Sequence, residues 1–278
     1  MAKKTKKRTI VGSPLTPELL CELDAVRKFP RPSEDFDPNG RWANTYRIWT
    51  CHGYRQSGNQ DVGFLRITRS ADGSNETFTL KAYQEVVETD GMQNVIEATI
   101  ECMNNQLASP TQWHLSSRFF DAGGKIINDL ATDEKGLIDA NVMSIKSSHH
   151  TLKREVARQL TCDWCLFEAV QRLSFDRESS LAFDLLEGLS LPKEDQHLSH
   201  RGVKRIRISD EEVSLHQFCQ LGRGVLPYEY WLDDSHRLLA VITMNKAYIL
   251  DEQAESIIKQ TTEQLRKSYR RSKNLQRK

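Results

Sequence analysis

The fold class is decided by one stretch, Leu226-Pro227-Tyr228-Glu229-Tyr230-Trp231-Leu232-Asp233-Asp234-Ser235-His236-Arg237-Leu238-Leu239-Ala240-Val241. An aromatic run and an aliphatic run flank a polar centre, so the stretch predicts a β-hairpin with strands over 227–232 and 237–244. Asp233 and Asp234 could bind a cation or act as acid and base. Adjacent side chains at a hairpin tip diverge, however, so we expect these carboxylates to hydrogen-bond the backbone of the turn.

Runs of alternating apolar and polar residues, separated by short polar turns, extend on both sides of this hairpin. Alternation places every second side chain on one face, which is the pattern of half-buried strands. Short turns favour pairing between strands that are neighbours in sequence, so we expect about nine or ten strands in nearly sequential antiparallel order. The remaining expected strands cover 46–55, 63–69, 78–82, 96–102, 113–119, 137–146, 203–208 and 213–220. The segments 148–160 and 181–191 suit either helix or strand, and 35–44 and 191–202 are expected loops.

Three segments have helical character. Thr16 and Pro17 suit the cap and the first position of an N-terminal helix, 164–173 has a 3.6-residue pattern, and a C-terminal helix begins near Asp251 with acidic residues at its start. A long sheet must bury one face and control its edges. The sequence therefore predicts a single α+β domain over 14–265, in which a large antiparallel sheet curves like a half-barrel beside these three helices. Residues 1–13 are expected to be a basic disordered tail, and 266–278 a basic frayed helix end.

The composition is that of a globular protein, because 38% of the 278 residues are hydrophobic and 28% are charged. The net charge of +1 conceals a segregation, since twelve Lys and Arg lie in the two terminal segments. Without them 27 positive charges face 38 negative ones, so the body carries about −11. Basic ends of this kind serve solubility or contact a polyanion or an anionic membrane surface.

The chain start is basic, but 9–14 is too short for the apolar region of a signal peptide. No run approaches the roughly 18 apolar residues of a membrane-spanning helix. We therefore expect a cytoplasmic protein, unless the start codon is misassigned and a leader is missing. The cysteines of such a protein are expected to be reduced and mostly buried. They are Cys21, Cys51, Cys102, Cys162, Cys165 and Cys219.

Motifs that would carry catalysis are sparse. Cys162-Asp163-Trp164-Cys165 has the CxxC spacing of redox proteins, but no second CxxC completes a zinc site. Neighbouring residues of a strand point to opposite faces, so His149 and His150 are not expected to bind one metal ion together. Asp195-x-His197-x-x-His200 lies in an expected loop, whose conformation does not by itself bring these side chains together. The sequence has no Gly-x-Ser-x-Gly, Walker or HExxH motif. We expect no metal, no cofactor and no enzymatic activity, and leave open a redox role of the cysteine pair.

The strand order and the Trp231-Leu232-Asp233 hairpin, with Arg237-Leu238 following, resemble the half-barrels of LolA/LolB-type lipoprotein carriers and related uncharacterised β-rich families over about residues 45–250. Members are normally exported, whereas this chain has no recognisable leader. The resemblance implies a concave sheet face that holds acyl chains or another apolar ligand. The aromatic residues that could line it, or could instead pack in the core, are Trp49, Phe64, Trp113, Phe119, Tyr228, Tyr230 and Trp231.

The leading hypothesis is a non-catalytic binding or scaffold protein whose concave face holds an apolar ligand, such as a lipid, or a partner segment. The alternative is a protein that associates with nucleic acid or an anionic surface through its basic tails. An unrecognised hydrolase is the third interpretation. The three differ in what they predict: a co-purifying apolar molecule, salt-dependent retention on a polyanion, or a turnover that depends on one acid or histidine.

Overall fold

A computed structural model describes residues 36–50, 60–71, 76–88, 90–147, 150–156, 159–176, 180–208 and 211–275. Within these ranges fifteen strands form one sheet, accompanied by two α-helices and two short 3-10 helices. The strands are β1 (Trp42–Thr50), β2 (Gln60–Ala71), β3 (Thr77–Val87), β4 (Gln93–Met103), β5 (Pro110–Phe120), β6 (Thr132–Asp139), β7 (Val142–Ser147), β8 (Thr151–Glu155), β9 (Leu160–Cys162), β10 (Ser180–Glu187), β11 (Leu191–Ile208), β12 (Glu211–Gly222), β13 (Tyr228–Leu232), β14 (Leu238–Ile242) and β15 (Lys246–Leu250). The helices are α2 (Asp163–Ala169), α3 (Ala254–Leu275), η2 (Asn128–Leu130) and η3 (Val170–Arg172).

The sheet has the order β8-β7-β6-β5-β4-β3-β2-β1-β15-β14-β13-β12-β11-β10-β9. Sequence neighbours are therefore neighbours in the sheet, as the short turns predict, and pairing of β1 with β15 joins the two meanders. The sequence predicted nine or ten strands, fewer than the fifteen in the described residues. The sheet is also mixed rather than purely antiparallel, because β9 pairs with β10 in parallel after the chain has crossed through α2 and η3.

The hairpin that decides the fold class is confirmed. β13 and β14 pair antiparallel, and the carboxylate of Asp233 organises the turn between them. Its Oδ1 accepts hydrogen bonds from the Ser235 amide at 2.9 Å, the Ser235 hydroxyl at 2.6 Å and the Arg237 amide at 2.9 Å. Asp233 therefore stabilises the turn by hydrogen bonds, as expected from the sequence.

The prediction of a loop over 191–202 is wrong, because these residues form the first part of the 18-residue strand β11. The segment is polar in composition, yet Gln196, Leu198 and His200 alternate as buried side chains on one face. Pairing with both β10 and β12 gives the backbone N–H and C=O groups of this segment hydrogen-bond partners, which in a polar loop would be water molecules. The expected loop over 35–44 likewise gives way to β1 at Trp42. Of the ambiguous segments, 148–160 contains β8 and most of 181–191 lies in β10.

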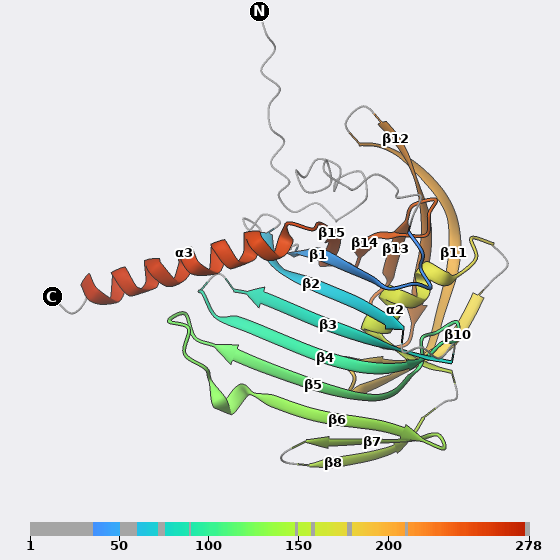
Figure 1. Cartoon of the computed structure of the whole chain (residues 1–278), viewed down its shortest axis with the longest axis horizontal. Coiled ribbons are helices and arrows are strands. Elements are labelled where there is room, and N and C mark those ends of the chain that lie inside the picture. Colours follow the sequence, from blue (N-terminus) through green and yellow to red (C-terminus); the bar gives the residue numbers. More distant parts are fainter. Residues whose placement is uncertain are drawn as a thin grey trace, which may run out of the picture.

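The sheet curves strongly, and α2 lies on its concave side (Figure 1). The edge strand β9 approaches the β4–β5 turn, where the Thr161 hydroxyl donates a buried hydrogen bond of 2.6 Å to the Leu107 carbonyl. Near the other edge, Arg154 of β8 pairs with Glu194 of β11 at 3.1 Å. The sheet thus curls back toward itself but remains open, with β8 and β9 at its ends.

Helix α3 packs on the opposite, convex face of the sheet. Ala254 and Ile258 form a small buried cluster with Phe64 of β2 and Val87 of β3. Arg66 of β2 holds the first turn of the helix through Glu255 at 2.6 Å. Contacts with the sheet continue to Arg266, which donates a hydrogen bond to the Gln93 side chain. The rest of the helix extends away from the sheet to Leu275 (Figure 1).

The mid-chain and C-terminal helices are therefore confirmed, whereas the expected N-terminal helix and tail lie outside the described residues. None of the helices in the described ranges is long and apolar enough to cross a membrane.

Candidate functional site

The concave face of the sheet, where an apolar ligand was expected, holds the protein's own helix α2. Six of its seven residues are buried. Phe167 reaches into the centre, where its ring packs edge-on against Tyr46 at 5.3 Å and Tyr248 at 5.4 Å, and lies 6.4 Å from Tyr230. In the described part of the chain, α2 thus takes the place of a ligand in contact with the central strands.

Polar groups also fix this helix. Gln171 of η3 is fully buried, and its side-chain oxygen accepts a hydrogen bond of 3.0 Å from the backbone N–H of Leu238. Its amide nitrogen donates to the Phe167 carbonyl at 2.9 Å. Because a buried polar group is costly when unpaired, these bonds favour one position of the helix relative to β14.

A buried ion triad completes the attachment. Glu168 of α2 has no exposed surface and binds Arg69 of β2 at 2.9 Å and Arg172 of η3 at 2.6 Å. Arg69 also donates to the backbone carbonyls of Asn39 and Gly40, and Arg172 donates to that of Asn105 at 2.6 Å. The triad therefore connects α2 to β2, to the chain before β1 and to the β4–β5 turn.

The seven aromatic residues proposed for a cavity fall into separate environments. Trp113, Tyr230 and Trp231 are buried in the main core, and Phe64 is buried beneath α3. Trp49 and Tyr228 are half-buried against the main core, and Phe119 is half-buried near the end of β5. The Tyr230 hydroxyl donates to Gln220 at 3.0 Å, and burial raises the pKa of Tyr228 to about 12. The described residues do not bring these seven side chains together around one cavity.

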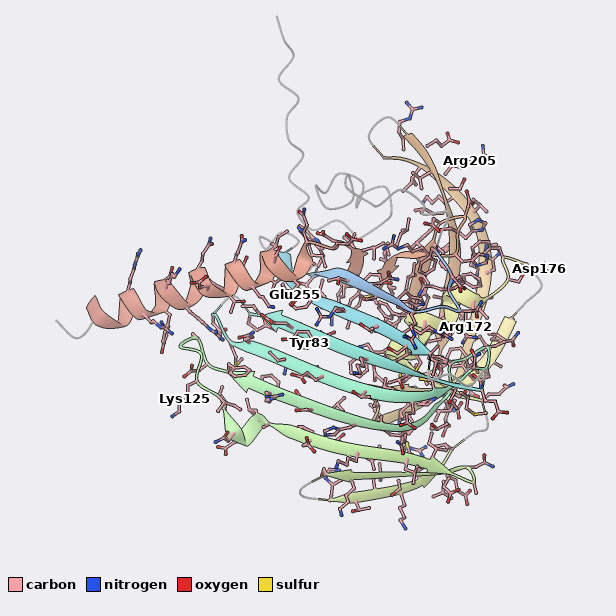
Figure 2. The ribbon with its side chains drawn as sticks, in the orientation of Figure 1. Tyr83, Lys125, Arg172, Asp176, Arg205 and Glu255 are labelled. Carbon is pink, nitrogen blue, oxygen red and sulfur yellow. The ribbon has the colours of Figure 1, made fainter. Side chains whose placement is uncertain are left out.

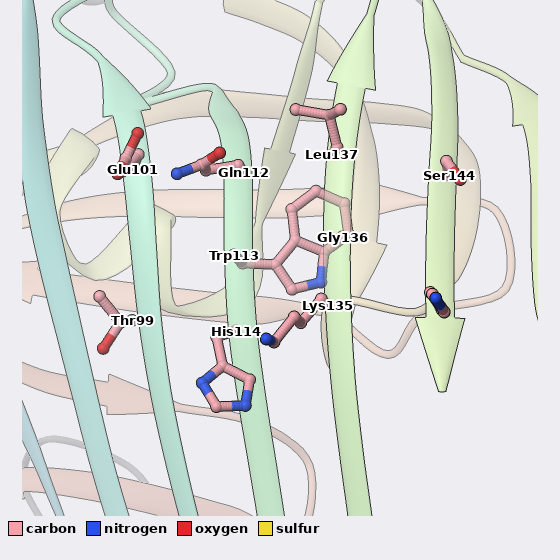
Figure 3. Close-up of a pocket in the computed structure, with 10 residues that line it drawn as sticks. Thr99, Glu101, Gln112, Trp113, His114, Lys135, Gly136, Leu137 and Ser144 are labelled. Carbon is pink, nitrogen blue, oxygen red and sulfur yellow. The ribbon is translucent and has the colours of Figure 1, made fainter. Parts of the chain in front are cut away.

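A surface groove of about 400 Å³ lies across β4, β5, β6 and β7 (Figure 3). Alternation along the strands separates the two faces of the sheet. Ile100, Trp113 and Ile145 are buried, whereas their neighbours in sequence point outward into the groove. Trp113 is buried and also lines the groove. The indole of Trp113 reaches from β5 to Gly136 of β6, where an added Cβ would lie 1.9 Å from the ring. The outward lining residues are Thr99, Glu101, Gln112, His114, Lys135, Leu137, Ser144 and Lys146.

Three basic side chains stand in one row across this groove. His114 of β5 is the register partner of Lys135 of β6, and Lys135 is the register partner of Lys146 of β7. All three side chains are exposed. His114 Nε2 lies 2.9 Å from Asp133 Oδ2, whereas Glu101 is the acid that lines the groove itself. Lys135 and Lys146 are directly opposed like charges, which destabilise a sheet, so this pair favours an anionic occupant.

Sequence reasoning missed this row. His114, Lys135 and Lys146 are far apart in the chain and belong to no motif. Their alignment depends on the register of two successive strand pairs, and a shift by one residue would move each side chain to the other face. The sequence did show the alternation of apolar and polar residues, which assigns each residue to one face of the sheet. It does not show how one strand is aligned with the next, so it could not reveal the row.

A second groove of about 490 Å³ lies where β9 and β10 approach the β4–β5 turn. Polar residues such as Asn105, Ser109 and Gln159 line much of it. Arg172 also lines it, but its guanidinium already binds Glu168 and the Asn105 carbonyl. The positive charge of Arg172 is therefore already paired with Glu168 inside the protein.

Histidines gather around one phenylalanine. The ring of Phe175 lies between those of His216, at 3.6 Å, and His236, at 3.9 Å, and both pairs are nearly parallel. Burial and the neighbouring His216 lower the pKa of His236. In the Asp195-x-His197-x-x-His200 stretch of β11, His200 is buried and His197 is exposed. No group of three or more His, Cys, Asp or Glu in the described ranges is arranged to hold a metal ion.

Comparisons with known proteins show similarity to solved structures but not to family models or curated sequences. No family model and no curated protein matches the chain. Among solved structures, the chain is similar to a beta-barrel-like protein of the domain of unknown function DUF1849 from Brucella abortus, with 10% sequence identity and a TM-score of 0.47 over 75% of this chain and 94% of that one. The resemblance to LolA/LolB-type carriers is not confirmed.

Proposed function

We propose that the protein is a non-catalytic binding protein that holds an acidic segment of a protein partner in the groove over β4–β7. The observation that carries this proposal is the row of His114, Lys135 and Lys146 across the groove. Thr99, Gln112 and Ser144 are placed beside it and can donate hydrogen bonds to carboxylates.

The dimensions of the sheet suit a short extended segment. Neighbouring strands lie about 4.8 Å apart, so the four strands of the groove span roughly 14 Å, the length of about four extended residues. Acidic residues at alternate positions of such a segment would face the sheet together. The contact area is small, so we expect a weak, salt-dependent complex whose charges contribute to specificity and association rate.

An apolar ligand on the concave face is the other form of the binding hypothesis. Such a ligand would have to displace α2, and with it the buried side chains of Leu166, Phe167 and Ala169. It would also break the ion triad of Glu168. Native mass spectrometry with organic extraction distinguishes the two forms, since the apolar form requires a stoichiometric apolar molecule in the purified protein.

The test of the groove is binding of a fluorescently labelled octapeptide of alternating Glu and Ser, followed by anisotropy at low salt. We expect Lys135→Glu combined with Lys146→Glu to weaken binding at least ~10-fold, because the variant places two carboxylates in the groove. The matched control is Lys125→Glu with Arg207→Glu, which changes the net charge equally at two exposed sites outside the groove. Equal losses in both variants, or no binding by the wild type, would refute the proposal.

A second candidate function rests on the exposed basic end of α3. Buried side chains of the helix end at Thr262, whereas Lys267, Arg270 and Arg271 are exposed on the part that extends from the sheet (Figure 1). In Figure 2, Arg205 likewise lies near the tip of the β11–β12 hairpin. These cations support association with nucleic acid. We expect Arg270→Glu with Arg271→Glu to reduce the salt dependence of duplex DNA binding, with anionic vesicles as the comparison that would favour a membrane surface instead.

A further inference from the structure

Three cysteines from two distant parts of the sequence meet beneath the concave face. Cys102 lies on β4, Cys162 ends β9 and caps α2, and Cys165 lies in the first turn of α2. The Sγ atoms of Cys162 and Cys165 are 3.0 Å apart, and those of Cys102 and Cys165 are 3.7 Å apart. All three thiols are fully buried.

The cluster fits a disulfide better than a metal centre. Structural zinc sites take four converging ligands. The described residues supply only three thiols here, and these are not arranged so that they could hold a metal ion. A disulfide needs an S–S distance of about 2.05 Å, so Cys162 and Cys165 have to close by about 1 Å. The Cys102–Cys165 pair would have to close by about 1.7 Å and pull α2 against the end of β4.

Burial decides when the bond can form. It raises the pKa of all three thiols, so little thiolate is present in the folded protein. A small-molecule oxidant also cannot reach a sulfur without exposed surface. Oxidation is therefore expected while the chain folds, before α2 is covered, or during local opening of this region.

We propose that Cys162 and Cys165 form an intrachain disulfide when the chain folds in the presence of a small-molecule disulfide, with Cys102 as an unpaired thiol beside it. With glutathione disulfide as oxidant, one thiolate of the pair attacks a glutathione sulfur, forms a mixed disulfide and releases one glutathione. The second thiolate attacks the protein sulfur of that intermediate and expels the other glutathione. Two protein thiols are oxidised, and one glutathione disulfide is reduced to two glutathione molecules.

The full-length protein is refolded from denaturant with excess glutathione disulfide, quenched with acid and alkylated after denaturation. The wild type should carry four alkyl groups instead of the six found after reduction. Trypsin places Cys162 and Cys165 in one peptide, 159–172, and Cys102 in another, 82–118. We expect peptide 159–172 to lose the mass of two hydrogens without a cross-link to 82–118.

Variants give an independent check. Cys162→Ser should retain all five of its thiols, whereas Cys102→Ser and the control Cys219→Ser should each still lose two. Incubation of the already folded wild type should give the same product at least ~10-fold more slowly, because the thiols are buried. Six alkyl groups in the refolded wild type, a bond that contains Cys102, or a bond elsewhere would overturn the proposal, and peptide mapping of the wild type decides this even where a variant fails to fold.

Discussion

Substitution of Glu168 by Gln removes the central charge of the buried triad and nearly preserves the side-chain shape. Gln can accept a hydrogen bond from one guanidinium but carries no charge to balance two. The side chains of Arg69 and Arg172 are only 2% and 10% exposed, so water cannot replace the lost carboxylate. Glu168→Gln should therefore destabilise the protein through two uncompensated buried cations.

The expected size follows from this burial. Removing one partner of a buried ion pair costs about 3–5 kcal/mol, because the remaining charge stays desolvated. At ~2–4 °C per kcal/mol for a chain of this size, the melting temperature should fall by about 6–20 °C. Arg69 lies over the ring of Phe78, with its guanidinium carbon 4.3 Å from the ring centroid, and this contact remains in the variant.

The measurement is urea unfolding of the wild type and the variant, with the slope m compared to confirm that both unfold from similar compact states. The matched control is Glu97→Gln, because Glu97 forms a 3.2 Å ion pair with Arg118 in which both side chains are about half exposed. Exposed pairs contribute about 0–1 kcal/mol. A loss below about 1 kcal/mol for Glu168→Gln, equal to that of the control, would show that the triad does not hold α2.

Three further substitutions test other parts of the structure. Gly136→Ala should cost about 1–3 kcal/mol in urea unfolding, because its Cβ would lie 1.9 Å from the Trp113 ring, and Trp113→Val in the same chain should reduce that cost. Trp231→Ala should cost about 3–5 kcal/mol, since the ring is buried, and a thermal melt equal to that of the wild type would contradict its place in the core. Burial raises the pKa of Asp163 from 3.8 to about 6, so ionisation opposes folding above pH 6 and the wild type gains stability as the pH falls from 6 toward 3.8. Asp163→Asn should accordingly stabilise the protein by about 2–3 kcal/mol at pH 8 and by little at pH 4, and an equal effect at both pH values would exclude this cause.

Local patterns in the sequence were sufficient for the elements whose signals are local. The β13–β14 hairpin depends on turn chemistry that Asp233 and Ser235 carry themselves. Helix α2 follows from the 3.6-residue spacing after Trp164, and α3 from its acidic start and apolar stripe. In each of these elements the partners that stabilise the backbone lie within a few residues, so a single sequence contains the information.

Long-range pairing could not be obtained in the same way. The polar start of β11 is strand because β10 and β12 lie on either side of it, and neither neighbour is visible in the composition of 191–202. The basic row of the groove needs the register of β5, β6 and β7. The contact of Cys102 with Cys165 also needs the curl of the sheet around α2, since the two residues are 63 positions apart. Such features require the tertiary structure.

The polar groups of the concave side bear on where a ligand can bind. Gln171, Gln196 and Gln220 are fully or almost fully buried, and each has hydrogen-bond partners within the protein. An apolar molecule entering between α2 and the sheet could replace the packing of Phe167, but it could not replace the partners of Gln171 or Glu168. Each unsatisfied neutral group would cost about 1–3 kcal/mol, and a charged group more. Binding on the outer face leaves this network intact, because the inner and outer side chains of a strand are separated by the backbone. The proposed binding of an acidic segment in the groove over β4–β7 would therefore leave α2 fixed.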